Sequence, residues 1–200
     1  MKKTFAALFL STGAALLVYV MSGISLLATT FVILICALVI GSFIWRKSSE
    51  NKRLDLKRRV VTGLIAGALA TALYDVFRFL LIKITGIMFW PFDIFNIFGK
   101  ALVGAEQAGF WVTILGFVFH IANGIGFGIA YTIAFGERGI WMGILWAMIL
   151  EAMMVTVYPG WLGLKALDEF LSVSVFGHFV YGITLGYMAK RLILRKEVAS

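Results

Sequence analysis

The sequence predicts an all-α protein, a six-helix transmembrane bundle. Three observations lead to this fold class. The 200 residues are 62% hydrophobic and only 14% charged, and their mean hydropathy is +0.98. Apolar segments long enough to cross a hydrocarbon core of about 30 Å recur along almost the whole chain. Most basic residues lie in short stretches between or beyond these segments. A water-soluble globular fold is therefore excluded.

Six spans are expected, at about residues 4–21, 24–45, 60–84, 109–134, 139–158 and 169–189. The first begins with Lys2 and Lys3 before an apolar stretch, a pattern that is also typical of a signal peptide. We interpret it as the first helix, because no A-x-A-like cleavage site follows and a second apolar segment starts almost at once.

The distribution of basic residues predicts the orientation of the bundle. An even number of crossings places both termini on one side, together with the run from Arg46 to Arg59 and the basic tail after residue 189. Lys100 and Lys165 lie in the opposite loops. The positive-inside rule makes both termini cytoplasmic and turns residues 86–108 and 159–168 outward. The expected location is the cytoplasmic (inner) membrane of a bacterium or archaeon. The net charge of +8 thus reports orientation in a lipid bilayer, not binding to nucleic acid.

These spans divide the chain into five parts. We expect an N-terminal transmembrane hairpin over residues 1–50 and a basic cytoplasmic loop over 51–59. Two further hairpins follow over 60–134 and 135–189, and a basic cytoplasmic tail over 190–200 ends the chain. The first of these two hairpins contains an insert at 86–108.

The insert predicts a short outer helix that does not cross the membrane. Pro91 stands near the start of this helix, and Asp93, Asn96 and Lys100 form a narrow polar stripe on it. An amphipathic helix on the outer leaflet is the favoured interpretation, because it needs no cavity. The alternative is a re-entrant segment or lid over the bundle.

The two hairpins share a spacing pattern, which predicts a duplication. Each has a helix with small residues four apart that lead to an acid, then a helix with a histidine and two glycines four apart. The first copy contains Gly63, Gly67, Thr71, Asp75, His120, Gly124 and Gly128, and the second contains Gly139, Gly143, Ala147, Glu151, His178, Gly182 and Gly186. Both copies start on the cytoplasmic side, so they are parallel repeats. The glycines are expected to let neighbouring helices approach closely.

Counting along the spans places two acids and both histidines of the chain at a similar depth. We expect Asp75, His120, Glu151 and His178 to converge as an ion- or proton-binding cluster. Supporting side chains are expected from Tyr74, Arg78, Asn123, Ser174 and Tyr181, with Arg78 braced by Asp75 and extending to the outer surface.

Several chemistries suit such a cluster, and no catalytic residue is assigned. The four groups could simply form hydrogen bonds between helices. They could also exchange protons or ions, because intramembrane ionisable groups are rare and usually functional. A Zn, Fe or Mn site is a third interpretation, whereas bis-histidine haem fits poorly because each histidine has an acid nearby. The cofactor is therefore unknown. The predicted function is proton-coupled or ion-related transport or sensing, and the alternatives are a metal-dependent membrane enzyme or a structural subunit with a protein partner or a second copy of itself.

Part of the chain resembles the YagU-like inner-membrane proteins. The resemblance covers about residues 60–189 and depends on "GLIAGALATALYD" at 63–75, a Phe- and Pro-rich outer segment, a span with His120, and "EFLSVSVFGHFVYG" at 169–182. The first two helices and Glu151 depart from that family's pattern. The resemblance implies an inner-membrane location and topology, and it implies no biochemical activity.

Overall fold

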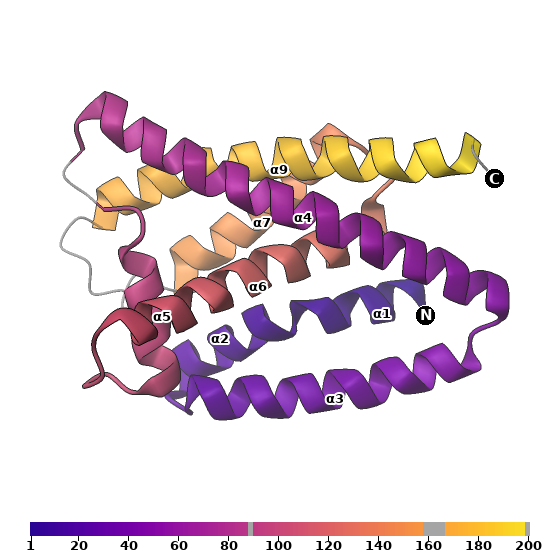
Figure 1. Cartoon of the computed structure of the whole chain (residues 1–200), viewed down its shortest axis with the longest axis horizontal. Helices are drawn as coiled ribbons and strands as arrows, with labels where there is room; N and C mark the ends of the chain where they lie inside the picture. Colours follow the sequence, from indigo (N-terminus) through magenta and orange to yellow (C-terminus); the bar gives the residue numbers. More distant parts are fainter. Residues whose placement is uncertain (88–89, 158–166, 199–200) are drawn as a thin grey trace.

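The computed structural model describes residues 1–87, 90–157 and 167–198 and is built from helices (Figure 1). In chain order these are α1 (Lys2–Ala7), the 3-10 helix η1 (Leu8–Leu10), α2 (Ser11–Ser22), α3 (Leu26–Lys47), α4 (Glu50–Thr85), α5 (Asp93–Val103), α6 (Phe110–Phe135), α7 (Ile140–Val157) and α9 (Leu167–Val198). No strand occurs in the described residues.

The described part of the chain contains six helical segments that are long and apolar enough to span a membrane, as the sequence predicts. They are Lys2–Ser22, Leu26–Lys47, Glu50–Thr85, Phe110–Phe135, Ile140–Val157 and Leu171–Arg195. Both chain termini lie at one end of the bundle (Figure 1). Most of the expected outer loop 159–168, with Lys165, falls outside the described residues.

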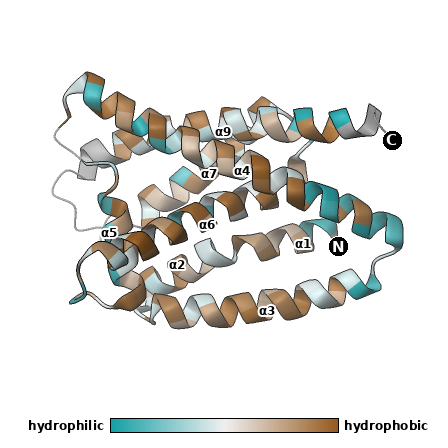
Figure 2. Cartoon of the chain, viewed as in Figure 1, coloured by the Kyte–Doolittle hydropathy of each residue, from teal (hydrophilic) through white to brown (hydrophobic). Residues whose placement is uncertain are grey.

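The basic segment 51–59 is not a loop. It forms the first turns of α4, which runs for 36 residues and is therefore about 54 Å long. Lys, Arg, Glu and Leu are good helix formers, and this stretch has no Gly or Pro to end the helix. In the same way α9 continues to Val198 through most of the predicted tail. Hydrophilic residues gather on α4 and α9 at the end of the bundle that holds the termini (Figure 2).

The first span packs on α6, and the second lies further out. The α1–α2 segment approaches α6 at Gly126, where a Cβ atom would come within 2.6 Å of the Phe9 carbonyl oxygen. The α3 helix packs mainly along α2 and leaves a row of large apolar side chains exposed, among them Phe31, Leu38 and Phe43. This surface suits contact with lipid tails.

Glycines set the spacing of the two central helix pairs. A Cβ atom at Gly128 of α6 would lie 2.4 Å from the Gly67 Cα atom of α4. A Cβ atom at Gly143 of α7 would lie 2.8 Å from the Gly186 Cα atom of α9. No real Cβ atom tolerates such distances, so only glycine permits these backbone contacts, and each pair forms the hairpin that the spacing predicts.

The hairpins meet along one side only. The α4 helix packs along α9, whereas α6 and α7 barely touch. The short helix α5 lies at the end of the bundle opposite the termini (Figure 1) and packs closely on α6. A Cβ atom at Gly116 would come within 1.6 Å of the Phe95 carbonyl oxygen, so the α5 backbone rests directly on α6.

Candidate functional site: two acid–histidine pairs

The first pair joins α4 to α6. Asp75 Oδ2 lies 3.0 Å from the Nε2 atom of His120, and both side chains are largely buried. The glycine contact between Gly67 and Gly128 holds the two helices close enough for this hydrogen bond. Because the carboxylate accepts, Nε2 carries the proton of the neutral imidazole, and Nδ1 has a free lone pair.

The second pair joins α7 to α9 in the same way. Glu151 Oε2 lies 2.7 Å from the Nδ1 atom of His178, and the Glu151 side chain is only 5% exposed. The same carboxylate oxygen accepts a hydrogen bond from Ser174 Oγ at 3.0 Å. The Nδ1 atom also lies 3.1 Å from the Ser174 carbonyl oxygen, which can only accept, so in the neutral imidazole Nδ1 carries the proton and Nε2 has the free lone pair.

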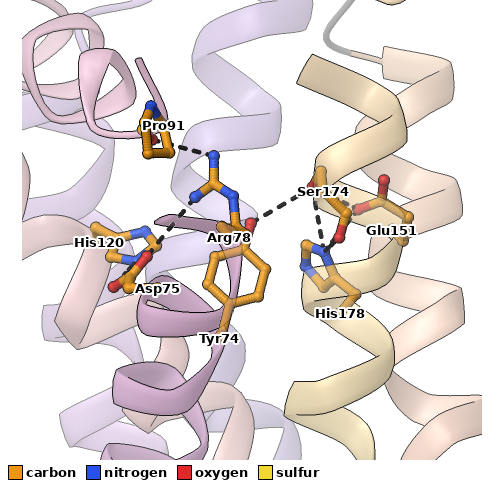
Figure 3. A network of polar contacts seen from close by, with 8 residues as sticks. All are labelled: Tyr74, Asp75, Arg78, Pro91, His120, Glu151, Ser174 and His178. Carbon is orange, nitrogen blue, oxygen red and sulfur yellow. Dashed lines mark hydrogen bonds and ion pairs between the residues drawn. The ribbon is translucent and has the colours of Figure 1, made fainter. Parts of the chain in front are cut away.

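A hydroxyl bridge connects the two hairpins between these pairs (Figure 3). The Tyr74 hydroxyl lies 3.4 Å from Ser174 Oγ. Because Ser174 gives its only proton to Glu151, Tyr74 is the donor in this bond. The Tyr74 ring also lies between the two imidazoles, with ring centroids 6.0 Å from His120 and 4.9 Å from His178.

Arg78 does not extend to the outer surface, which corrects the expectation from the sequence. Its side chain is 1% exposed and lies 4.8 Å above the Tyr74 ring. Nη2 donates to the Pro91 carbonyl at 3.0 Å, and Nη1 lies 3.6 Å from Asp75 Oδ1. These buried partners, among them the Pro91 carbonyl just before α5, hold the guanidinium inside the bundle.

The other predicted supporting residues also belong to this region. Tyr181 donates from its hydroxyl to the Gly124 carbonyl at 2.7 Å, which links α9 to α6. Asn123 is buried on α6, and its amide oxygen has no hydrogen-bond partner among the described residues. Ser174 is fully buried between the hairpins.

A pocket of about 260 Å³ lies where α6 and α7 separate. The polar groups on it include both histidines, Tyr74, Arg78, Asn123 and Tyr181. Asp75 and Glu151 are not among the residues that line it, so each acid contacts its histidine away from the pocket surface. The remaining surface is apolar and comes from α2, α5, α6 and α7, including Leu17, Phe98 and Met154.

Sequence reasoning missed three parts of this site. The first span contributes Leu10, Gly13 and Leu17 to the pocket, although it stands outside the repeat. The α5 helix supplies the Phe95 ring, whose centroid lies 5.2 Å from that of His120. Gly177 of α9 leaves space for Arg78, because a Cβ atom there would lie 2.9 Å from the Arg78 side chain. The sequence shows only that this glycine comes directly before His178.

The arrangement favours two separate pairs over one four-residue centre. Within residues 1–87, 90–157 and 167–198, no three Cys, His, Asp or Glu side chains are grouped so that they could hold a metal ion. Each imidazole instead has one carboxylate partner. Such a pair holds the ring in one tautomer and stabilises the imidazolium that forms when the second nitrogen accepts a proton.

The model of one protein family matches residues 57–200, and that family is DUF6789, a family of unknown function. The match includes both central hairpins and leaves out the first two spans. No curated protein and no solved structure matches the chain.

Proposed function

The chain belongs to DUF6789, and we propose that it is a membrane protein that takes up and releases protons at its two acid–histidine pairs during transport or sensing. The observation that supports this proposal is the pairing itself. Each of the two histidines lies within 3.0 Å of the acid of its own hairpin, inside a helix bundle. Charged groups in such places are costly to bury and are usually functional.

Proton exchange suits these pairs better than a purely structural role. Hydrogen bonding between helices could be provided by amides or hydroxyls, which carry no charge. Histidine is the side chain whose protonation changes between pH 5 and 8, and a carboxylate on one nitrogen supports the charged ring when the other nitrogen takes a proton. The second nitrogen of each ring is the one not used by the acid, and both rings line the pocket.

The bridge from Tyr74 to Ser174 provides a connection between the pairs. It leads from the ring beside His120, through two hydroxyls, to the Glu151 carboxylate. A change of charge on Glu151 or His178 therefore acts directly on a group of the first hairpin. This supports a joint response of the two pairs.

We further propose that the protein lies in a cytoplasmic membrane with both termini inside. Support comes from the end of the bundle that holds the termini (Figure 1), where Arg53 donates to the Arg46 carbonyl and Lys2 pairs with Asp55, because the positive-inside rule places such basic groups in the cytoplasm. The family match does not test the resemblance to YagU-like proteins, which stays a prediction. Lipid is the proposed surrounding of the apolar outer faces, such as that of α3.

A duplicated hairpin is also part of the proposal. The contact between Gly67 and Gly128 has a counterpart in the contact between Gly143 and Gly186, and each acid meets the histidine of its own copy. An unbroken two-fold arrangement would also require α6 to pack on α7 as α4 packs on α9. The α6 and α7 helices separate instead, and the pocket lies between them.

Histidine-selective ¹⁵N NMR in lipid nanodiscs tests the proton proposal, because the chain has only two histidines. We expect both rings to take up a proton as the pH falls from about 8 to 5. Asp75→Asn should alter proton uptake at His120 more than at His178, and Glu151→Gln should do the reverse. Glu106→Gln, in an exposed loop, serves as the control and should alter neither. A ring that keeps one protonation state across this range would overturn the proposal.

A further inference from the structure

The pocket between α6 and α7 presents hydrogen-bond acceptors at the end of an apolar chamber. In the neutral rings the Nε2 proton of His120 faces the Asp75 carboxylate, and the Nδ1 proton of His178 faces the Ser174 carbonyl and Glu151, so the free nitrogens are Nδ1 of His120 and Nε2 of His178. Both are acceptors. Any occupant that satisfies them must bring a donor.

Asn123 gives an independent indication of the same chemistry. Its side chain lines the pocket and is 8% exposed, and its amide oxygen has no hydrogen-bond partner among the described residues. Buried polar atoms of this kind are normally paired, because an unpaired acceptor loses its interaction with water. The Asn123 oxygen is thus a third acceptor that lacks a donor.

The charge and shape of the pocket narrow the class of ligand. Arg78 lines the pocket, whereas the two acids lie behind their histidines, so a cationic head would meet a guanidinium. An anionic head would bring only acceptors to the imidazole nitrogens and the Asn123 oxygen, and the Arg78 guanidinium is already held by the Pro91 carbonyl and Asp75. The chamber walls are leucine, phenylalanine and methionine side chains of α2, α5, α6 and α7, which suit an apolar body.

We propose that this pocket binds a lipid-soluble alcohol, with its hydroxyl group donating to the imidazole and Asn123 acceptors and its apolar body between α2, α6 and α7. The inference rests on the same two pairs as the proposed function, but it does not require them to exchange protons. The hydroxyl binds while both rings are neutral.

The test uses four ten-carbon probes with the full-length protein in nanodiscs at pH 8. The probes are decanol, decyl methyl ether, decylamine and decanoate, and the readout is the ¹⁵N signal of each free imidazole nitrogen. Decanol should shift these signals and reach saturation. The ether has the same body without a donor and should give no saturable shift.

Two variants and a matched control make the result specific to the pocket. Asn123→Ala should raise the half-saturating decanol concentration about fivefold, the effect of one lost hydrogen bond. Ala14→Phe places a ring in the pocket from α2 and should abolish the shift, whereas Ala28→Phe on the exposed part of α3 should leave it unchanged. If Ala14→Phe already changes the imidazole signals in the absence of a probe, the fivefold effect expected for Asn123→Ala becomes the test of the proposal.

The proposal is overturned if the ether binds as well as decanol, if decylamine or decanoate binds more tightly, or if decanol causes no shift and the pocket holds only water. Proton uptake is measured without any alcohol from pH 8 to 5. If the rings take up no proton, decanol can still bind at pH 8. If decanol does not bind, the rings can still take up protons.

Discussion

The Tyr74 hydroxyl lies 3.4 Å from Ser174 Oγ, and this hydrogen bond joins α4 of the first hairpin to α9 of the second. It is buried, and it ends at the Glu151 carboxylate that holds His178. The bridge thus connects the Glu151–His178 pair to a tyrosine of the first hairpin whose ring lies beside His120.

Removing this hydroxyl should weaken the protein modestly. We expect Tyr74→Phe to lower the free energy of unfolding by about 1 kcal/mol, because one buried hydrogen bond is lost while the ring remains. Thermal unfolding in detergent measures the change. Tyr187→Phe is the matched control, since that tyrosine is exposed and its hydroxyl accepts a hydrogen bond from the exposed Arg191. Equal losses in the two variants would contradict the role of the bridge.

Replacing His178 should show that Glu151 needs a polar partner. His178→Leu leaves a buried carboxylate without its imidazole and should lower the free energy of unfolding by about 3–5 kcal/mol. His178→Gln keeps a hydrogen-bond donor and should cost only about 1 kcal/mol. It should also abolish any pH-dependent activity, because glutamine does not titrate near neutral pH.

The double variant Glu151→Leu with His178→Leu completes this comparison. Replacing both partners by apolar residues should recover most of the stability lost in His178→Leu, since no charge is then left buried alone. Unfolding of all variants under the same detergent conditions gives the interaction energy. Additive losses would show that the pair does not act as a unit.

Much of the fold follows from the sequence because lipid constrains it strongly. Apolar segments of the right length must be helices, as every backbone group needs a partner inside the bilayer. Glycines four apart predicted where helices meet, and Gly67 and Gly143 do contact the opposing backbones. Counting along the spans predicted one cluster of two acids and two histidines, whereas the structure has two acid–histidine pairs.

Other features depend on contacts that no local pattern records. Arg78 is buried because the Pro91 carbonyl and the Tyr74 ring lie beside it. Pro91 belongs to the insert, and no local pattern shows that the insert lies next to Arg78. The contribution of Leu10 and Gly13 to the pocket follows from the packing of η1 and α2 on α6. Helix ends were also missed, because basic residues that mark the membrane boundary still favour helix, and α4 therefore starts at Glu50.

Adding a methyl group at the glycine contacts should separate the helices. Gly128→Ala and Gly186→Ala should each lower the free energy of unfolding by about 1–3 kcal/mol, because the new Cβ would meet backbone atoms at 2.4 and 2.6 Å. Gly41→Ala is the control, since its Cβ would meet a flexible Leu8 side chain at 3.3 Å. Similar losses at Gly128 and Gly186 are expected if the hairpins are copies, and a loss at only one would count against duplication.

Cysteine labelling checks the orientation of the bundle. In a Cys36→Ser background, an impermeant maleimide added outside intact cells should label Gln107→Cys but not Lys52→Cys. Both positions are exposed, and they lie at opposite ends of the bundle. Permeabilised cells should label both, which controls for reactivity. Labelling of Lys52→Cys alone in intact cells would place the termini outside.

Acidification should weaken the end of the bundle that holds the termini. Arg59 donates to Glu137 in the α6–α7 connection, and this hydrogen bond lowers the pKa of Glu137 below its ordinary value of 4.5. Arg59 also pairs with Asp55, which in turn meets Lys2. Since the folded-state pKa of Glu137 is the lower one, its contribution is full above the unfolded value and is lost as the pH falls through the folded value.

We therefore expect Glu137→Gln to be less stable than the wild type at pH 7 and equally stable once the pH is well below 4. The difference at pH 7 should be under about 1 kcal/mol, because the Glu137 side chain is 55% exposed and water screens the pair. Thermal unfolding in detergent between pH 7 and 3 measures it, with Glu106→Gln as the control. The Asp55 pairs titrate in both proteins, so the difference isolates Glu137. A difference that grows as the pH falls would show that the Arg59 bond does not stabilise the ionised carboxylate.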